Sequence, residues 1–290
     1  MSPLTRIICL ANSRKRQARC IAGINPKTGK WVRPVCDDLH PDNGRIPMSV
    51  RRMRGREPKL LDIIELPLAQ TGNNFGFASE NLSVLPGQWK RVMKFKAIDL
   101  FPYCDRSDFI LHNNWKYVFK SDLASLSFEQ RQTLQLLRVN EFQVESQLKN
   151  GGQVHWKGSI RTDDGRTLSE ANITDPMFCR KLEEGYRPEG NYLVTVSLSM
   201  PWSPPDWDKG DPCWKLIAGV IELPDPNIIA FAAKEEDLIE WSDRELERIG
   251  WGTEQGRRYL IEHFRKRSRH HLMREEFARF LSDLQVFPSN

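Results

Sequence analysis

The chain has 290 residues, of which 39% are apolar and 28% are charged, and its formal net charge is +5. This composition is ordinary for a folded protein and excludes wholesale disorder, while the length suggests about two domains. No apolar run approaches the roughly 18 residues of a membrane helix, and the opening MSPLTRIICLANSRKR lacks the layout of a signal peptide, so a cytoplasmic location is expected.

The positive charge is concentrated at the N-terminal end. Residues 1–60 hold 14 Lys and Arg against 4 Asp and Glu, a net charge of +10, so residues 61–290 carry −5. A basic surface on a small β-module is the electrostatic signature of a protein that binds a phosphate backbone. The charge distribution therefore favours nucleic acid over small-molecule chemistry.

The opening residues predict three strands with short connections, at 6–11, 18–24 and 30–35. The second connection, Asn25-Pro26-Lys27-Thr28-Gly29, has turn chemistry, because proline fixes φ and glycine accepts positive φ. Three strands joined in this way form a meander, the usual start of a small antiparallel barrel. A further strand is expected at 60–66, after a polar and basic stretch at 37–59.

The middle of the chain predicts one helix and then a second β-rich stretch. Leucines favour a helix over 121–137, although 86–136 is otherwise irregular. Thr162-Asp163-Asp164-Gly165 predicts a hairpin turn, because Asp-Gly favours positive φ. Strands are expected at 191–199 and 213–223.

The last part of the chain has helical periodicity. Apolar residues at helical spacing predict helices over 234–249, 254–264 and 272–284. Thr253 is a suitable N-cap for the second of these helices.

A short internal repeat links the two β-rich stretches. Ile21-Ala22-Gly23-Ile24 and Ile217-Ala218-Gly219-Val220 each follow a cysteine, an apolar strand and a turn. Four matching residues can arise by chance, but the matched context favours two copies of one β-module.

Several strings together resemble the bacterial dual OB-fold domain proteins. They are RIICLANSRKRQARCIAGI, GKWVRPV, LLDIIELPL, ITDP at 173–176, YLVTVSLS and CWKLIAGVIEL, in consistent order over residues 5–223. The C-terminal string GWGTEQGRRYLIEHFRKRSRHHLMREEFARFL is similar to a helical extension that some of these proteins carry.

The resemblance implies a mainly β protein with some α. We expect two OB-like antiparallel barrels packed as one unit, the first and basic barrel over 1–118 and the second over 119–226, with a small helical module over 227–290. The resemblance also implies nucleic-acid binding, often in an antiviral-defence or mobile-element setting. It brings no catalytic residues, so function has to be argued from sites.

Lys30-Trp31-Val32-Arg33 is the first candidate site. On a strand, Trp31 and Arg33 share one face, and an aromatic beside a cation offers base stacking and a phosphate contact. The alternative is that Trp31 fills the barrel and Arg33 binds an acid.

Two further groups of cations lie in the basic N-terminal part. Arg14, Lys15, Arg16 and Arg19 cluster in and after the first turn, and Arg51, Arg52, Arg54 and Arg56 follow in the polar stretch. Either group could contact phosphates, and either could be a solvated turn, which usually carries charge.

A third basic group is Arg265, Lys266, Arg267 and Arg269, between two predicted helices. It could contact a nucleic-acid backbone, form a solvated helix junction or bind an acidic partner.

No catalytic motif is found. Asp62 with Glu65, Asp163 with Asp164, and Asp175 lack neighbours at a spacing that builds a two-metal site. No cofactor or metal site is expected, and the six cysteines have no C-x-x-C pair and are expected to be reduced, buried thiols.

The sequence therefore predicts a non-enzymatic nucleic-acid-binding protein, with single strands favoured because OB grooves suit splayed bases. The alternative is an adaptor that binds a protein partner through its C-terminal helices. A metal-dependent nuclease is the least supported interpretation.

Overall fold

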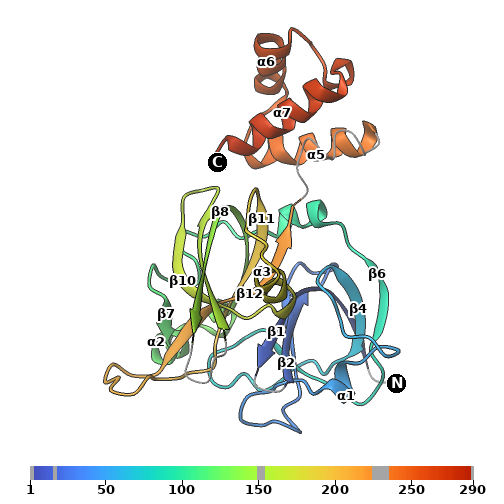
Figure 1. Ribbon diagram of the computed structural model, residues 1–290. Coiled ribbons are helices and arrows are strands. Elements are labelled where there is room, and N and C mark those ends of the chain that lie inside the picture. The colour runs from blue at the N-terminus through green and yellow to red at the C-terminus, as the bar shows by residue number, and fades with distance from the viewer. Residues whose placement is uncertain (1–2, 16–17, 149–153, 224–234, 289–290) are drawn as a thin grey trace.

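Two β-sheets pack against each other, and a group of helices stands at one end of them (Figure 1). The computed structural model describes residues 3–15, 18–148, 154–223 and 235–288. Within these residues, no helix has both the length and the apolar character needed to cross a membrane.

The first sheet is built from the N-terminal strands. Their bounds are β1 Leu4–Lys15, β2 Ala18–Ile24, β3 Trp31–Val35, β4 Asp62–Pro67, β5 Asn81–Ser83 and β6 Lys90–Lys94, in the order β5-β3-β2-β1-β4-β6. The β3–β5 pair is parallel. An isolated antiparallel bridge pairs Leu68, directly after β4, with Val84, directly after β5.

The second sheet is a closed barrel with one added strand. Its strands are β7 Tyr117–Phe119, β8 Leu134–Leu148, β9 Val154–Thr162, β10 Thr167–Ile173, β11 Tyr192–Leu198 and β12 Pro212–Glu222, in the order β10-β9-β8-β11-β12-β7. A parallel pairing of β10 with β12 closes five of these strands into a barrel. The predicted Asp-Gly hairpin is the β9–β10 connection, where Gly165 has φ +92°.

Short helices accompany the sheets, and three longer helices form the C-terminal group. The α-helices are α1 Met48–Arg51, α2 Lys120–Ser125, α3 Pro176–Glu183, α5 Glu235–Arg248, α6 Thr253–Phe264 and α7 Arg274–Val286. Segments of 3₁₀-helix lie at Ala97–Tyr103, Phe128–Gln130 and Arg269–His271. The three predicted C-terminal helices are confirmed as α5, α6 and α7.

Asp175 explains the ITDP string. One carboxylate oxygen caps α3 by accepting hydrogen bonds from the Met177 and Phe178 amides, and the other accepts one from the Val220 amide of β12. Pro176 occupies the first turn, where a missing N–H costs nothing. This aspartate therefore fixes α3 to the closed barrel, which is a structural role.

The fold class is confirmed as mainly β with α, and two details of the expectation are corrected. Each sheet contains a parallel pair, so neither is purely antiparallel, and only the second is closed by a ladder. The helix expected over 121–137 is confirmed only as α2, because the run from Leu134 to Val139 is wholly buried and pairs as β8. The segment also buries Gln135 and Arg138, so its apolar residues do not mark the alternation of a half-buried strand.

Some residues on the N-terminal side of the expected limit between the two barrels pack in the core of the closed barrel. The limit between residues 118 and 119 falls inside β7, and Phe77, Ile110 and Leu111 already pack in the core of the closed barrel. The second limit, between residues 226 and 227, lies outside the described residues. The limits themselves stay a prediction.

Small residues allow the two sheets to approach closely. Ala11, Ala22 and Ala218 pack with Leu134 where the sheets meet. A Cβ atom on Gly219 would lie 2.1 Å from the Leu10 carbonyl oxygen of β1. The internal repeat thus places its Ala-Gly pairs in or beside the contact between the modules.

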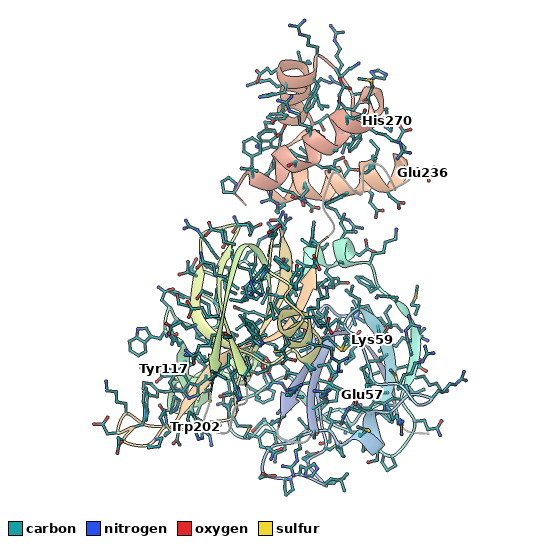
Figure 2. The ribbon with its side chains drawn as sticks, viewed as in Figure 1. Glu57, Lys59, Tyr117, Trp202, Glu236 and His270 are labelled. Atoms are coloured by element: carbon teal, nitrogen blue, oxygen red, sulfur yellow. The ribbon has the colours of Figure 1, made fainter. Side chains whose placement is uncertain are left out.

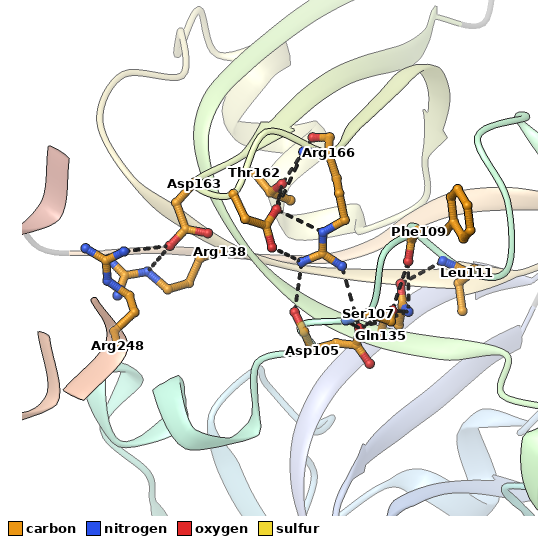
Figure 3. A network of polar contacts seen from close by, with 11 residues as sticks. Asp105, Ser107, Phe109, Leu111, Gln135, Arg138, Thr162, Asp163, Arg166 and Arg248 are labelled. Atoms are coloured by element: carbon orange, nitrogen blue, oxygen red, sulfur yellow. Dashed lines mark hydrogen bonds and ion pairs between the residues drawn. The ribbon is translucent and has the colours of Figure 1, made fainter. Parts of the chain in front are cut away.

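The C-terminal helices share a core with both sheets. Leu10 of β1, Leu136 of β8, and Trp241 and Phe280 of the helices belong to one apolar cluster. A buried polar network adds to it: Arg138 Nη1 donates to Glu245 at 2.9 Å, and Arg248 Nε donates to the same carboxylate at 2.7 Å. Figure 3 shows Asp163 between Arg138 and Arg248, at 3.3 and 3.4 Å.

Gly219→Ala is expected to destabilise the protein, because the new methyl group meets a backbone oxygen that cannot rotate away. Overpacking of this kind lowers the free energy of unfolding by about 1–3 kcal/mol. Urea denaturation measures the change. The control is Gly256→Ala in α6, where the added Cβ makes ordinary contact at 3.4 Å with the Leu246 side chain. That control should keep or gain stability, and equal losses in the two variants would contradict the close contact.

Candidate nucleic-acid interface

A cavity of about 660 Å³ lies between the two sheets. Side chains from both sheets line it, and cations outnumber carboxylates. The cations are Arg14, Lys15, Arg33, Lys116, Lys157 and Lys215, and the carboxylates are Asp42 and Glu170. The cavity therefore carries a net positive charge and attracts anions.

Arg33 and Trp31 point toward the second sheet, as alternation along β3 requires. Arg33 is buried, with 7% of its surface exposed; its Nη2 donates to Ser197 Oγ at 3.2 Å and to the Thr133 carbonyl at 3.5 Å. Trp31 is half-buried and packs on the alanine cluster between the sheets. Trp31 and Arg33 thus share one face of β3, as the alternation predicts, but this face is turned toward the second sheet. Of the two residues, only Arg33 lines the cavity.

Lys215 is the most deeply buried cation of the cavity. It is 3% exposed, and its Nζ donates to the Asn113 carbonyl at 2.5 Å and to Asn113 Oδ1 at 3.0 Å. Burial lowers the pKa of this lysine to about 7. Sequence reasoning missed Lys215, because nothing in the string CWKLIAGVIEL distinguishes it from a surface lysine.

An aromatic cluster borders the cavity. The Tyr117 ring centroid lies 5.2–5.6 Å from those of Trp115, Phe119, Trp207 and Trp214. Trp202 lies beside this cluster, because Trp214 Nε1 donates a hydrogen bond to the Trp202 carbonyl at 2.8 Å. The Trp202 side chain is 61% exposed. Trp202 and Trp214 both line the cavity. Figure 2 shows Trp202 and Tyr117 near each other at the end of the molecule away from the helices.

The predicted cations of the first turn divide between the cavity and its surroundings. Arg14 and Lys15 line the cavity; Arg14 is exposed, and Lys15 Nζ donates to the Asn43 carbonyl at 2.5 Å. Arg19 instead lies 3.4 Å from the Glu57 carboxylate. Arg16 lies outside the described residues, and Lys30 is exposed in the turn before β3.

One member of the second predicted group, Arg51, contacts Glu57 in the loop that precedes β4. Arg51 is buried, donating to Glu57 at 2.9 Å and to the Ile46 carbonyl at 2.7 Å. Partial burial raises the pKa of Glu57, but the hydrogen bond and charge of Arg51 outweigh this and hold the pKa below its usual value. Arg51 thus stabilises the loop, while the remaining arginines, Arg52, Arg54 and Arg56, are exposed.

The third predicted group lies in the helical module. Arg269 contacts Ser242 Oγ and Asp243, each at 2.6 Å, and so fixes this segment to α5. Arg265 ends α6 in the left-handed region at φ +54° and is exposed, as is Arg267, while Lys266 is half-buried. Figure 2 shows the neighbouring His270 at the opposite end of the molecule from Trp202, so this group is separate from the cavity.

A second cavity, of about 720 Å³, has a different electrostatic character. Its lining includes Trp31, Arg138, Arg244 and Arg248. Each of these arginines forms an ion pair with Asp or Glu, Arg244 with Asp99 at 2.5 Å. The charges of these three arginines are therefore compensated within the protein.

No metal site is apparent in the part of the chain that the structure describes, where no three His, Cys, Asp or Glu gather closely enough to hold an ion. All six cysteines are free. Cys9, Cys36 and Cys213 are buried, and the other three are half-buried. Burial raises the pKa of Cys36 to about 11 and that of Cys213 to about 12, which keeps these thiols protonated.

Lys215 should make stability depend on pH. Below pH 7 the lysine is charged in both states, and the folded protein bears the full cost of burying the charge. Between about pH 7 and its ordinary pKa of 10.5, the unfolded chain holds the proton that the folded protein has lost, so stability rises with pH. Denaturation should be measured for the wild type and for Lys215→Met across pH 6–10. The free energy of unfolding of the wild type, relative to that of the variant, should increase with pH, with a slope that approaches about 1.4 kcal/mol per pH unit. A difference independent of pH would contradict the lowered pKa.

Comparison with known proteins finds a match to a family model over most of the chain. A family model described as a dual OB-containing domain matches residues 5–220. An uncharacterized protein, slr1353, of Synechocystis sp. (strain ATCC 27184 / PCC 6803 / Kazusa) is 38% identical over 72 residues, which span 25% of this chain and 23% of that protein. The crystal structure of the tetrameric p202 HIN2 matches with a TM-score of 0.20 and 11% identity, over 71% of this chain and 88% of that one, a likeness too low to carry an argument.

Proposed function

The chain belongs to the dual OB-containing domain family, and on this premise we propose that it binds nucleic acid, with single strands preferred, in the cavity between its two sheets. The observation that carries the proposal is the meeting of cations from both sheets beside an exposed indole. Arg14 comes from β1, Lys157 from β9 and Lys215 from β12, and Trp202 lies at the border of the same cavity.

The preference for single strands follows from the chemistry of the aromatic border. A base can stack on Trp202 only after it has left its own helix, and a single strand offers unstacked bases at low cost. The cations supply the other half of the interaction, because they contact phosphates whatever the sequence. We therefore expect binding that depends strongly on salt and weakly on base sequence.

Other parts of the expected function stay predictions. A setting in antiviral defence or in a mobile element rests on the family resemblance, whereas a cytoplasmic location and a protein partner bound through α5–α7 rest on the sequence. In this proposal the chain acts by binding and has no catalytic step.

Reversing charges at the cavity should weaken binding. Arg14→Glu combined with Lys157→Glu removes two phosphate contacts, so the affinity for a single-stranded oligonucleotide should fall at least tenfold, and the slope of log K against log salt should become shallower by about 0.7 per lost contact. Fluorescence anisotropy at several salt concentrations measures both. Lys90→Glu combined with Lys94→Glu, on the exposed edge strand β6, makes the same change of charge away from the cavity and should cost much less. Equal losses in the two double variants would refute the cavity as the binding site.

Removing the exposed indole should weaken binding without changing its salt dependence. Stacking of a base on an aromatic side chain contributes about 1–3 kcal/mol, so Trp202→Ala should lower the affinity by roughly 5- to 150-fold. The salt slope should stay the same, because no phosphate contact is lost. Phe128→Ala is the control, because it removes an exposed aromatic side chain that belongs neither to the cavity lining nor to the cluster around Tyr117. Equal losses in the two variants would contradict stacking on Trp202.

A further inference from the structure

We propose that the inner part of the cavity is a site for the phosphomonoester group of a nucleotide, carried by the end of a strand or by a free nucleoside monophosphate. This inference rests on the proposed function and deepens it, because it assigns to the cavity the end of a nucleic acid in addition to its continuous backbone. The residues that carry it are Arg33 and Lys215.

Two buried cations, which have no carboxylate partner in the part of the chain that the structure describes, line this one cavity from its two sides. Arg33 comes from the first sheet and Lys215 from the second, and 7% and 3% of their surfaces are exposed. Among the described residues, neither takes part in an ion pair: Arg33 donates to Ser197 and Thr133, and Lys215 donates to Asn113. Buried charges are ordinarily paired, because removing an unpaired charge from water is unfavourable.

The other charged residues of the cavity leave this excess in place. Lys116 forms an ion pair with Glu170 and lowers the pKa of that carboxylate. Lys15 donates to a backbone carbonyl, and Arg14 and Asp42 are exposed. Lys157 is half-buried, and its charge also lowers the pKa of Glu170. The buried charges that remain to be matched inside the cavity are therefore those of Arg33 and Lys215.

A phosphomonoester fits this excess better than an internal phosphodiester. It carries a charge of about −1.5 to −2 at pH 7 and three acceptor oxygens, so it can match two cations at once. The backbone diester carries a single charge. The planar fork of an arginine suits phosphate oxygens, and Arg33 Nε is a buried donor with no hydrogen-bond partner in the described structure.

The cavity also has room for more than a phosphate. Its volume of about 660 Å³ falls within the usual range of small-molecule sites, roughly 300–1,000 Å³. Phe75, Trp202 and Trp214 line it together with the two buried cations. A phosphate held by Arg33 and Lys215 thus shares a cavity with aromatic surfaces that can stack the attached base.

The test compares strand ends on the full-length protein. A fluorescent single-stranded oligonucleotide is prepared with a 5′-phosphate, with a 3′-phosphate and with hydroxyl groups at both ends. At least one phosphorylated form should bind about tenfold or more tightly than the hydroxyl form, since hydrogen bonds to charged groups have this strength. A nucleoside monophosphate should displace the phosphorylated oligonucleotide, and the corresponding nucleoside should not. Lys215→Met should abolish the preference, while Lys90→Met on β6 should retain it.

The outcomes separate this inference from the proposed function. Equal affinity of all three oligonucleotides for the wild type overturns the phosphomonoester site and leaves nucleic-acid binding intact. Binding of the monophosphate alone, with no oligonucleotide bound, supports the site and overturns the proposed function; no binding of either overturns both. A folded Lys215→Met protein that keeps the preference also overturns the site. Because the end preference is measured on the wild type, the test does not depend on the variant folding.

Discussion

The contact between β1 and β12 has no room for a side chain at position 219, and the arrangement of the rest of the molecule depends on it. A bulge in β1 falls between Cys9 and Ala11, where it leaves Leu10 outside the ladder with β2. Thr195 Oγ1 donates to the Leu10 carbonyl at 2.8 Å, so the buried oxygen is satisfied by the other sheet. Gly219 lets β12 pass beside the same carbonyl.

The position of the cavity follows from that contact. On β1 the chain continues from Ala11 to Arg14, which lines the cavity a few residues beyond the contact. On β12 the cavity-lining Lys215 precedes Gly219 by four residues. The sheets meet through small residues at the contact and are separated where their side chains become long and charged. A single close approach thus places cations from both sheets around one space.

The sequence predicts the elements of this fold better than the way they meet. The apolar runs at β1, β2 and β11, the Asp-Gly turn and the helical periodicity of α5–α7 are local signals, and the structure confirms the elements they indicate. The segment around Leu134 is ambiguous in the sequence because Gln135 and Arg138 interrupt its apolar residues, although both side chains are buried in the fold. The burial of Arg33 and Lys215 could not be predicted, since it arises only when distant strands pack. For the same reason, the high tryptophan content was visible in the composition, but the cluster of Trp115, Trp207 and Trp214 around Tyr117 was not.

The buried charges of this protein follow two different patterns, and the contrast bears on function. Where the helical module meets the closed barrel, Arg138 and Arg248 share Glu245 and Asp163, so each buried cation has a carboxylate within the protein. Such a network ties the parts together, and removing one member would leave a partner uncompensated. In the cavity between the sheets, Arg33 and Lys215 have only neutral oxygens as hydrogen-bond partners among the described residues.

The lowered pKa of Lys215 is the energetic consequence of that second pattern, because the protein alone does not stabilise its charged form. An anion bound in the cavity would stabilise the charged form of Lys215, as a carboxylate would, and would raise the pKa of the lysine. An anion that binds the folded protein at this lysine would therefore also raise the free energy of unfolding, so that binding and stability report the same interaction. Under the proposed function, a bound anion offsets the cost of burying Lys215. Arg138 and Arg248 need no ligand, because carboxylates of the protein already compensate their charges.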